Sequence, residues 1–230
     1  MGRTIAIGDI HGCGKALREL LRVIEPTADD TIVLLGDYVD RGPDSRGVVD
    51  QLVELATRCQ VVGLRGNHEV MFLAVQQGGL PPEHWLRSGG QATLASYGGH
   101  LTRVPEEHLR FFLDLRPYYE TDEFIFVHAG YQPEVEMADQ PEATLYWDHL
   151  PPVTPAPHCS GKPVFVGHTP QGSGQPLDLG HLVCLDTYCF GGLWLTAMDV
   201  TTREIWQASY HGHLRRQPFQ WLRDLWRRRG

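Results

Sequence analysis

The first third of the chain alternates between short apolar runs and amphipathic stretches. Continuous apolar runs at residues 4–7, 31–35 and 60–64 have the length and character of buried strands. Residues 15–24 carry apolar side chains at helical spacing, and so does the stretch that follows Asp44, a suitable N-cap. The pattern therefore predicts successive strand–helix–strand units of about 30 residues, which place the polar ends of three strands at the same edge of one parallel sheet.

The pattern changes after residue 78. Residues 78 to about 115 contain short helical stretches broken by Gly and Pro, which indicates an insertion or cap over the sheet edge. Two further buried strands are predicted at residues 124–127 and 163–166, separated by a proline-rich segment that we expect to be mainly loop. Three later apolar runs are predicted as consecutive, antiparallel strands: residues 181–185, 194–200 and 204–209.

Length and charge set limits on the class of protein. The chain has 230 residues, of which 42% are hydrophobic and 21% charged, as in ordinary soluble globular proteins. The formal net charge of −8 argues against a nucleic-acid binder that works by broad phosphate neutralisation. Any recognition of phosphate must therefore come from a local site.

Cysteine usage and hydropathy favour a cytoplasmic protein. The chain has five cysteines and no CxxC pair, which fits reduced thiols better than a disulfide framework. It shows neither a basic and apolar leader nor an apolar run near twenty residues, so we expect no stable membrane insertion. Nothing in the sequence indicates an oligomeric state.

The end of the chain, residues 213–230, has a different character. Phe219, Leu222 and Trp226 can share one helical face while several arginines occupy the remainder, which predicts a basic amphipathic helix. Such a helix can dock on its own domain, touch a membrane surface or bind a partner.

Polar residues follow five of the predicted strands. They are Asp9 and His11, Asp37, Asn67 and His68, His128, and His168. Carboxylate, amide oxygen and imidazole are ligands for first-row divalent ions. Each histidine alone is a common structural residue, but together at one sheet edge these residues favour a metal site. The absence of paired cysteines disfavours a closed structural zinc site.

Asp37 is suited to bridge two ions about 3.5 to 4 Å apart. One ion would take Asp9, His11 and Asp37. The other would take Asp37, Asn67, His128 and His168. This ligand set accepts manganese, iron or zinc. The neighbouring Asp40 and Arg41 suit a site that holds both cations and a phosphate.

Five motifs carry a resemblance to a known family. They are GDIHG at 8–12, GDYVDRG at 36–42, GNHE at 66–69, HAG at 128–130 and GHT at 167–169. In their order and spacing the chain resembles the phosphoprotein phosphatases among the calcineurin-like metallophosphoesterases, over about residues 1–200. Residues 89–98 resemble the bacterial branch, which also contains the symmetrical diadenosine tetraphosphatases.

The resemblance implies an α/β fold in which two mixed β-sheets pack as a sandwich flanked by helices (αββα), with a small helical cap. We expect residues 1–212 to form this domain, with the cap inserted at about residues 78–115. The family's cofactors are two divalent metal ions per chain, here expected to be manganese, with iron or zinc as alternatives.

The resemblance also implies a mechanism. A metal-bound hydroxide attacks phosphorus directly, with no covalent enzyme intermediate. Arg41 would bind two phosphate oxygens in a fork. His68 would protonate the departing alkoxide, and Asp40 would hold the His68 imidazole protonated and oriented.

Two positions depart from the family pattern. A second phosphate-binding arginine is expected after a tryptophan, but Trp147 and Asp148 are followed by His149; either His149 or Arg116 could substitute. Tyr188 stands where bacterial relatives often carry glycine, and it either lines the substrate channel or packs in the core.

Three functions are consistent with this sequence. The first is a serine/threonine protein phosphatase that acts on a phosphorylated protein or peptide. The alternative is a diadenosine tetraphosphatase-like nucleotide hydrolase, which the acidic charge balance mildly disfavours. The third, a non-catalytic binding scaffold, is less consistent with the complete set of expected ligands.

Overall fold

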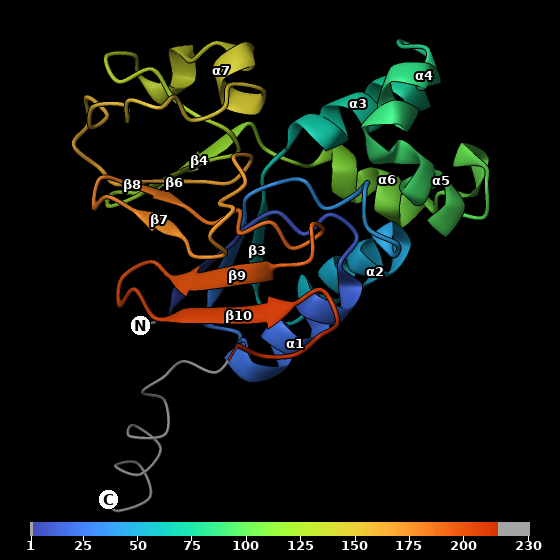
Figure 1. Ribbon diagram of the computed structural model, residues 1–230, viewed down its shortest axis with the longest axis horizontal. Helices are drawn as coiled ribbons and strands as arrows, with labels where there is room; N and C mark the ends of the chain where they lie inside the picture. Colours follow the sequence, from blue (N-terminus) through green and yellow to red (C-terminus); the bar gives the residue numbers. More distant parts are fainter. Residues whose placement is uncertain (1, 216–230) are drawn as a thin grey trace, which may run out of the picture.

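Two five-stranded sheets pack face to face at the centre of the computed structural model, which describes residues 2–215 (Figure 1). The first sheet has the strand order β10-β9-β1-β2-β3 and the second β4-β5-β6-β8-β7. The strands of the first sheet are β1 (Thr4–Ile7), β2 (Thr31–Leu34), β3 (Gln60–Gly63), β9 (Trp194–Asp199) and β10 (Ile205–Ser209). The strands of the second are β4 (Tyr118–Glu120), β5 (Ile125–Val127), β6 (Val164–Val166), β7 (Leu177–Asp178) and β8 (Leu182–Cys184).

Helices cover the outer faces of the sandwich. They are α1 (Gly14–Ile24), α2 (Ser45–Leu55), α3 (Asn67–Gln76), α4 (Pro82–Trp85), α5 (Gln91–Ser96), α6 (Glu106–Leu113) and α7 (Glu142–Tyr146). A turn (Leu86–Gly90) that is kinked at Gly89 joins α4 to α5. Figure 1 shows α3 to α6 gathered in one lobe, with α7 on the opposite side of the molecule. This arrangement confirms the predicted α/β sandwich of two mixed sheets flanked by helices.

Side chains of the first sheet alternate between two cores. Ala6 and Val33 face the second sheet and pack in one cluster with Phe126 and Phe165, whose rings stack with centroids 5.4 Å apart. Their neighbours Ile5, Ile7, Ile32 and Leu34 belong to the cluster that includes the helices. Because both faces are covered, these strands are apolar throughout, as buried parallel strands require.

The predicted parallel order of the first three strands is confirmed. Thr31 of β2 lies between Thr4 of β1 and Gln60 of β3, and both pairings are parallel. The Asp44 side chain accepts a hydrogen bond from the Gly47 amide at 3.1 Å, so Asp44 caps α2 as expected. The carboxyl ends of all three strands therefore meet at one edge.

The predicted antiparallel arrangement of the last three strands is only partly correct. β9 and β10 are antiparallel neighbours in the first sheet. β8 instead belongs to the second sheet and runs parallel to β6, with Val166 opposite Cys184. A short strand that is buried on both faces is apolar throughout, so its sequence does not indicate which strand it pairs with. The prediction paired β8 with β9 only because the two are consecutive in the chain.

The five strand ends that were expected at one sheet edge come from two sheets. Asp9, Asp37 and Asn67 follow strands of the first sheet, whereas His128 and His168 follow β5 and β6 of the second.

The segment 132–162 is mainly loop, as expected, but it also contains α7 and a 3₁₀ turn (Met137–Asp139).

Residues 82–113, within the predicted cap, form the helices α4 to α6 and a 3₁₀ turn (Leu101–Arg103). Aromatic packing joins this part to α3, because Phe72 lies 5.9 Å from Trp85 and 4.7 Å from Phe112 between ring centroids.

Residues 216–230 lie outside the described part of the chain, and with them most of the predicted amphipathic segment 213–230. Within residues 2–215, none of the helices has the length and apolar character to cross a membrane.

The closest contact between the ends of β1 and β8 depends on Gly8. A Cβ atom on Gly8 would lie 2.3 Å from the Leu185 carbonyl oxygen, which no side chain can tolerate. We expect Gly8→Ala to lower the free energy of unfolding by about 1–3 kcal/mol, since the two sheets must separate locally. The control is Gly172→Ala, because no atom lies within 4 Å of a Cβ at that position. Equal urea denaturation midpoints for the two variants would contradict this role of Gly8.

Candidate active site

The loops at the strand ends are held in strained conformations. Among the described residues, eight other than glycine have a positive φ angle, and six of them lie in these loops. The six are His11, Asp37, Asp40, Arg41, His168 and Tyr188. A backbone conformation of this kind costs of order 1–3 kcal/mol for each residue and persists only where the surroundings impose it. Such clustering is typical of a functional site.

Glu69 fixes the loop that carries Asp37. Its carboxylate is fully buried and accepts hydrogen bonds from the backbone amides of Gly66, Asp37 and Tyr38 at 2.9 to 3.0 Å. The loop after β1 is tied to the same segment, because the His11 amide donates to the Asp37 carbonyl at 2.8 Å. One side chain of the GNHE motif therefore sets the backbone around Asp37.

Three histidines are oriented by backbone carbonyls. His11 Nδ1 lies 2.9 Å from the Val39 carbonyl, and His128 Nδ1 lies 2.7 Å from the Leu35 carbonyl. In His168 the other ring nitrogen, Nε2, lies 3.1 Å from the Trp147 carbonyl. Since a carbonyl can only accept, the nitrogen beside it carries the hydrogen. The remaining nitrogen of each ring then carries no hydrogen and has a lone pair for a ligand, the usual arrangement of metal-binding histidines.

The free acceptor atoms converge on two points. Around the first, His128 Nε2 lies 3.2 Å from His168 Nδ1, and Asn67 Oδ1 lies 3.2 and 3.1 Å from these two nitrogens. Asp37 Oδ1 lies 3.5 Å from the same His128 nitrogen. Around the second, Asp37 Oδ2 lies 3.4 Å from His11 Nε2 and 4.0 Å from His68 Nε2. Asp37 therefore faces both points, as expected of a bridging residue.

Burial lowers the pKa of all three histidines, which favours their neutral forms. Desolvation is the largest cause for His11 and for His168, whose pKa falls to about 3. Neutral imidazoles with lone pairs only 3.2 Å apart repel each other unless a cation lies between them. The donor set thus fits a divalent cation.

The carboxylates point to the same conclusion. Asp9, Asp37 and Asp186 are each at most 3% exposed, and burial together with the charges of Asp186 and Asp37 raises the pKa of Asp9 well above its usual value. Asp186 Oδ2 has no hydrogen-bond partner among the described residues. Buried carboxylates are costly unless they are paired or bind metal. Bound cations would offset that cost.

Asp40 and His68 form a buried pair beside the cluster. His68 Nδ1 lies 2.7 Å from Asp40 Oδ2, and the imidazole is 1% exposed. Although burial opposes it, the Asp37 charge and the hydrogen bond to Asp40 raise the pKa of His68. Asp40 also accepts from the Trp85 indole at 2.9 Å and the Thr93 hydroxyl at 2.7 Å, both from the helical lobe. The pair is therefore held from two sides.

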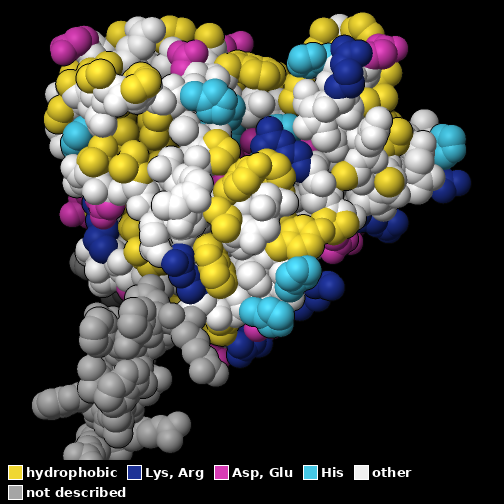
Figure 2. All heavy atoms as spheres, viewed as in Figure 1, with side chains coloured by type: hydrophobic (Ala, Val, Ile, Leu, Met, Phe, Trp, Pro, Cys, Tyr) yellow, Lys and Arg dark blue, Asp and Glu magenta, His cyan; other side chains and the backbone are white. Residues whose placement is uncertain are grey.

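Arg41 is the exposed cation of the site. Its amide donates to the Gly89 carbonyl at 3.1 Å, and its guanidinium lies 4.5 Å above the Phe190 ring and 3.1 Å from His11 Nε2. A Cβ on Gly89 would clash with the Arg41 backbone, so the positive φ of Gly89 and its lack of a side chain both serve this contact. Figure 2 shows basic and hydrophobic side chains next to each other near the middle of the visible face, where the helical lobe meets the rest of the molecule.

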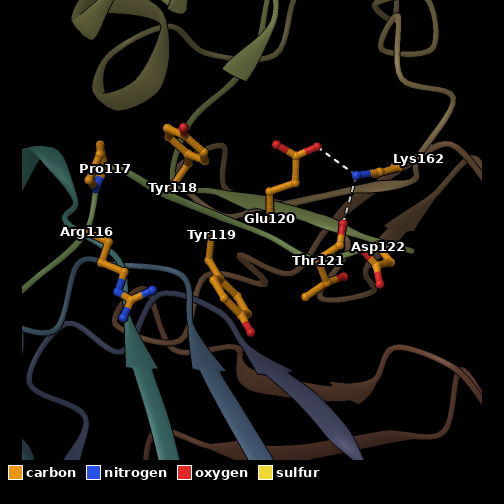
Figure 3. A pocket seen from close by; sticks show the side chains of 8 residues that line it. All are labelled: Arg116, Pro117, Tyr118, Tyr119, Glu120, Thr121, Asp122 and Lys162. Atoms are coloured by element: carbon orange, nitrogen blue, oxygen red, sulfur yellow. Dashed lines mark hydrogen bonds and ion pairs between the residues drawn. The ribbon is translucent and has the colours of Figure 1, made fainter. Parts of the chain in front are cut away.

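Of the two possible substitutes for a second phosphate-binding arginine, only His149 lies at the cluster. Its exposed ring stacks on His168 with centroids 4.4 Å apart. Arg116 instead packs over Tyr119 in a surface pocket of about 650 Å³, where Lys162 bonds to Glu120 (Figure 3). None of the strand-end residues lines that pocket. Tyr188 packs against Phe190, with ring centroids 4.8 Å apart.

The structure brings all nine predicted site residues to one place. Sequence reasoning missed four others: Glu69, Trp85, Thr93 and Asp186. Glu69 lies inside the GNHE motif and was visible there, whereas Trp85 and Thr93 act across 45 and 53 residues of sequence separation. Asp186 was missed because the direction of β8 was wrongly predicted.

Residues 2–191 match the family described as calcineurin-like phosphoesterase. A protein of Nitrosomonas europaea named symmetrical bis(5'-nucleosyl)-tetraphosphatase is 34% identical over 131 residues, which cover 56% of this chain and 45% of the relative. A protein of the same name from Burkholderia pseudomallei is 30% identical over 149 residues, covering 61% and 49%. The chain thus spans about half the length of these curated relatives.

Solved structures show the same fold. One provisionally named a diadenosine tetraphosphatase aligns with a TM-score of 0.70 over 90% of this chain and 93% of that chain, at 24% identity. A cold-active protein-tyrosine phosphatase of a psychrophilic Shewanella species aligns with a TM-score of 0.68 over 94% and 80%, at 15% identity. At these identities the likeness extends to the fold alone.

Removal of the Glu69 carboxylate is expected to release the loop after β2. Glu69→Ala leaves four buried amides without an acceptor. Each unsatisfied amide costs about 1–3 kcal/mol, so we expect a large loss of thermal stability. Glu54→Ala, at an exposed position of α2, is the control and should melt like the parent protein. Similar melting temperatures for the two variants in a calorimeter would show that Glu69 does not hold the loop.

Proposed function

The chain belongs to the calcineurin-like phosphoesterase family, and we propose on this basis that it is a dinuclear-metal-dependent hydrolase whose substrate is a dinucleoside tetraphosphate. A single observation carries the proposal. A buried cluster of metal-type acceptors, an exposed guanidinium and a buried imidazole with a raised pKa share one site. These are the three groups needed to bind a phosphate chain, attack it and protonate what leaves.

Residues at the two convergence points, together with Asp9, which accepts from the His168 amide, would hold the cations. We propose Asp37, Asn67, His128 and His168 for one ion, and Asp9, His11 and Asp37 for the other. When bound, two divalent ions acidify a bound water and draw charge from the phosphoryl oxygens. Manganese, iron and zinc all suit this donor set.

Arg41 and His68 would act directly on the substrate. The Arg41 guanidinium can bind two oxygens of one phosphate, and its place over Phe190 limits the orientations that it can adopt. His68 holds a proton at Nε2 while Nδ1 bonds to Asp40, so it can donate that proton to the leaving oxygen. Trp85 and Thr93 keep Asp40 in place for this task.

Two observations favour a dinucleotide over a phosphoprotein. Both relatives named above are called bis(5'-nucleosyl)-tetraphosphatases, and they are 34% and 30% identical to this chain over the aligned residues. In addition, the partly exposed ring of Phe190 lies under Arg41 and contacts the partly exposed ring of Tyr188, so a nucleobase could stack there next to a bound phosphate. The serine/threonine protein phosphatase that the motifs first suggested is therefore the second candidate, and a non-catalytic scaffold is the third.

A direct comparison of substrates tests the proposal. We expect kcat/KM for diadenosine tetraphosphate to exceed that for a phosphothreonine peptide by at least about 100-fold in the presence of Mn²⁺, because the peptide offers one phosphate and no base. The two rates should be measured by product release on the same preparation. The opposite order would establish the protein phosphatase, and no turnover of either substrate would favour the scaffold.

His68→Asn should separate proton donation from metal binding. We expect kcat to fall by roughly 10²- to 10⁴-fold while the metal content of the protein stays at the parental value. His108→Asn is the control, because His108 is equally buried but bonds to Tyr97 and Asp50 away from the cluster. His68 Nε2 lies 4.0 Å from Asp37 Oδ2. A halved metal content would therefore assign His68 to metal binding instead.

A further inference from the structure

A sixth strand also ends at the cluster. β8 runs parallel to β6, and the Leu185 amide donates to the Val166 carbonyl at 2.9 Å. Asp186 therefore follows β8 in the same way that His168 follows β6. The Leu185 carbonyl also lies against Gly8, immediately before Asp9. The fold thus places Asp186 between the ends of β1 and β6.

Only one of the two oxygens of the Asp186 carboxylate accepts a hydrogen bond among residues 2–215. Oδ1 accepts from the Tyr188 amide at 3.0 Å and so closes the turn after β8. The Asp186 carbonyl accepts from the Gln171 amide at 2.8 Å, which fixes the backbone. Oδ2 is buried and has no hydrogen-bond partner among residues 2–215. The side chain as a whole is 2% exposed.

The neighbours of Asp186 are mostly negative. Asp9 and Asp186 directly follow Gly8 and Leu185, which lie against each other where β1 and β8 end. The charge of Asp37 also acts on Asp186, and Arg41 supplies a positive charge nearby. A turn needs one acceptor oxygen and no charge, so the geometry of the turn does not account for a second, buried, anionic oxygen beside Asp9.

We propose that Asp186 belongs to the cation-binding set, with Oδ2 serving the ion that Asp9 and His11 would hold. This inference rests on the proposed metal centre and is independent of the substrate. Asp186 supplies negative charge and a free acceptor at the side of the site that has only one carboxylate besides Asp37. Oδ2 would contact the cation directly.

Asp186→Asn isolates this role. Its amide oxygen can still accept from the Tyr188 amide, so the turn survives while the charge and the free anionic oxygen are lost. We expect the affinity for Mn²⁺ at one of two sites to fall by roughly 10- to 100-fold, as measured by titration calorimetry on protein stripped of metal. The rise in melting temperature on addition of Mn²⁺ should shrink in parallel. Asp186→Ser, which also keeps an acceptor, provides a second variant if the first fails to fold.

Asp199→Asn is the matched control. Asp199 is also a buried aspartate at the end of a strand, and its Oδ1 accepts from the amides of Thr201 and Thr202. It pairs with Ile5 near the start of β1, far from the cluster, so it should leave Mn²⁺ affinity unchanged.

The outcomes separate the two proposals. If the parent protein binds two Mn²⁺ ions and the Asp186 variants bind both with the parental affinity, the role of Asp186 is overturned and the metal centre stands. If the parent protein binds no divalent ion, both fail. An equal loss of affinity in the Asp199 variant would trace the effect to general destabilisation and would also overturn the role of Asp186.

Discussion

Acceptor atoms that repel one another are held together in a buried space, and most of the local structure serves this purpose. The free nitrogens of His128 and His168 lie 3.2 Å apart with oxygens of Asn67 and Asp37 beside them. Such a cluster is unfavourable by itself, because its lone pairs and charges are hydrated in the unfolded chain and lose that hydration when they are buried. The cluster stays assembled because backbone carbonyls orient the histidine rings and the Glu69 carboxylate binds the amides of the loop that carries Asp37. The cations proposed for this site would convert the repulsion into binding free energy.

Much of this could be predicted because the signals are local. The apolar runs before Asp9, Asp37 and Asn67, with helices of regular length between them, define a parallel sheet and its polar edge. Short motifs then name the residues at that edge. The division of the strands between two sheets could not be predicted, because Val127 and Val166 end strands that are as uniformly apolar as those of the first sheet.

Three of the four residues that sequence reasoning missed, all but Glu69, act at long range or in an unexpected topology. Trp85 and Thr93 reach Asp40 only after the helical lobe has folded against the loop, and no periodicity encodes that contact. Asp186 became recognisable only when β8 was seen to run parallel to β6. In each case the missing information was a tertiary pairing, which depends on the packing of the whole molecule rather than on a window of sequence.

The contact between the helical lobe and Asp40 also affects how this scaffold could be re-engineered. Insertions beside an active site are attractive units to exchange between relatives when a new specificity is wanted. Here the helical lobe also supplies the indole and hydroxyl that orient the partner of His68, and Gly89 provides the carbonyl that fixes Arg41. A chimaera that replaces this lobe wholesale would change the recognition surface and disable the reaction machinery together. Successful grafts should therefore begin beyond these three positions and leave them in place.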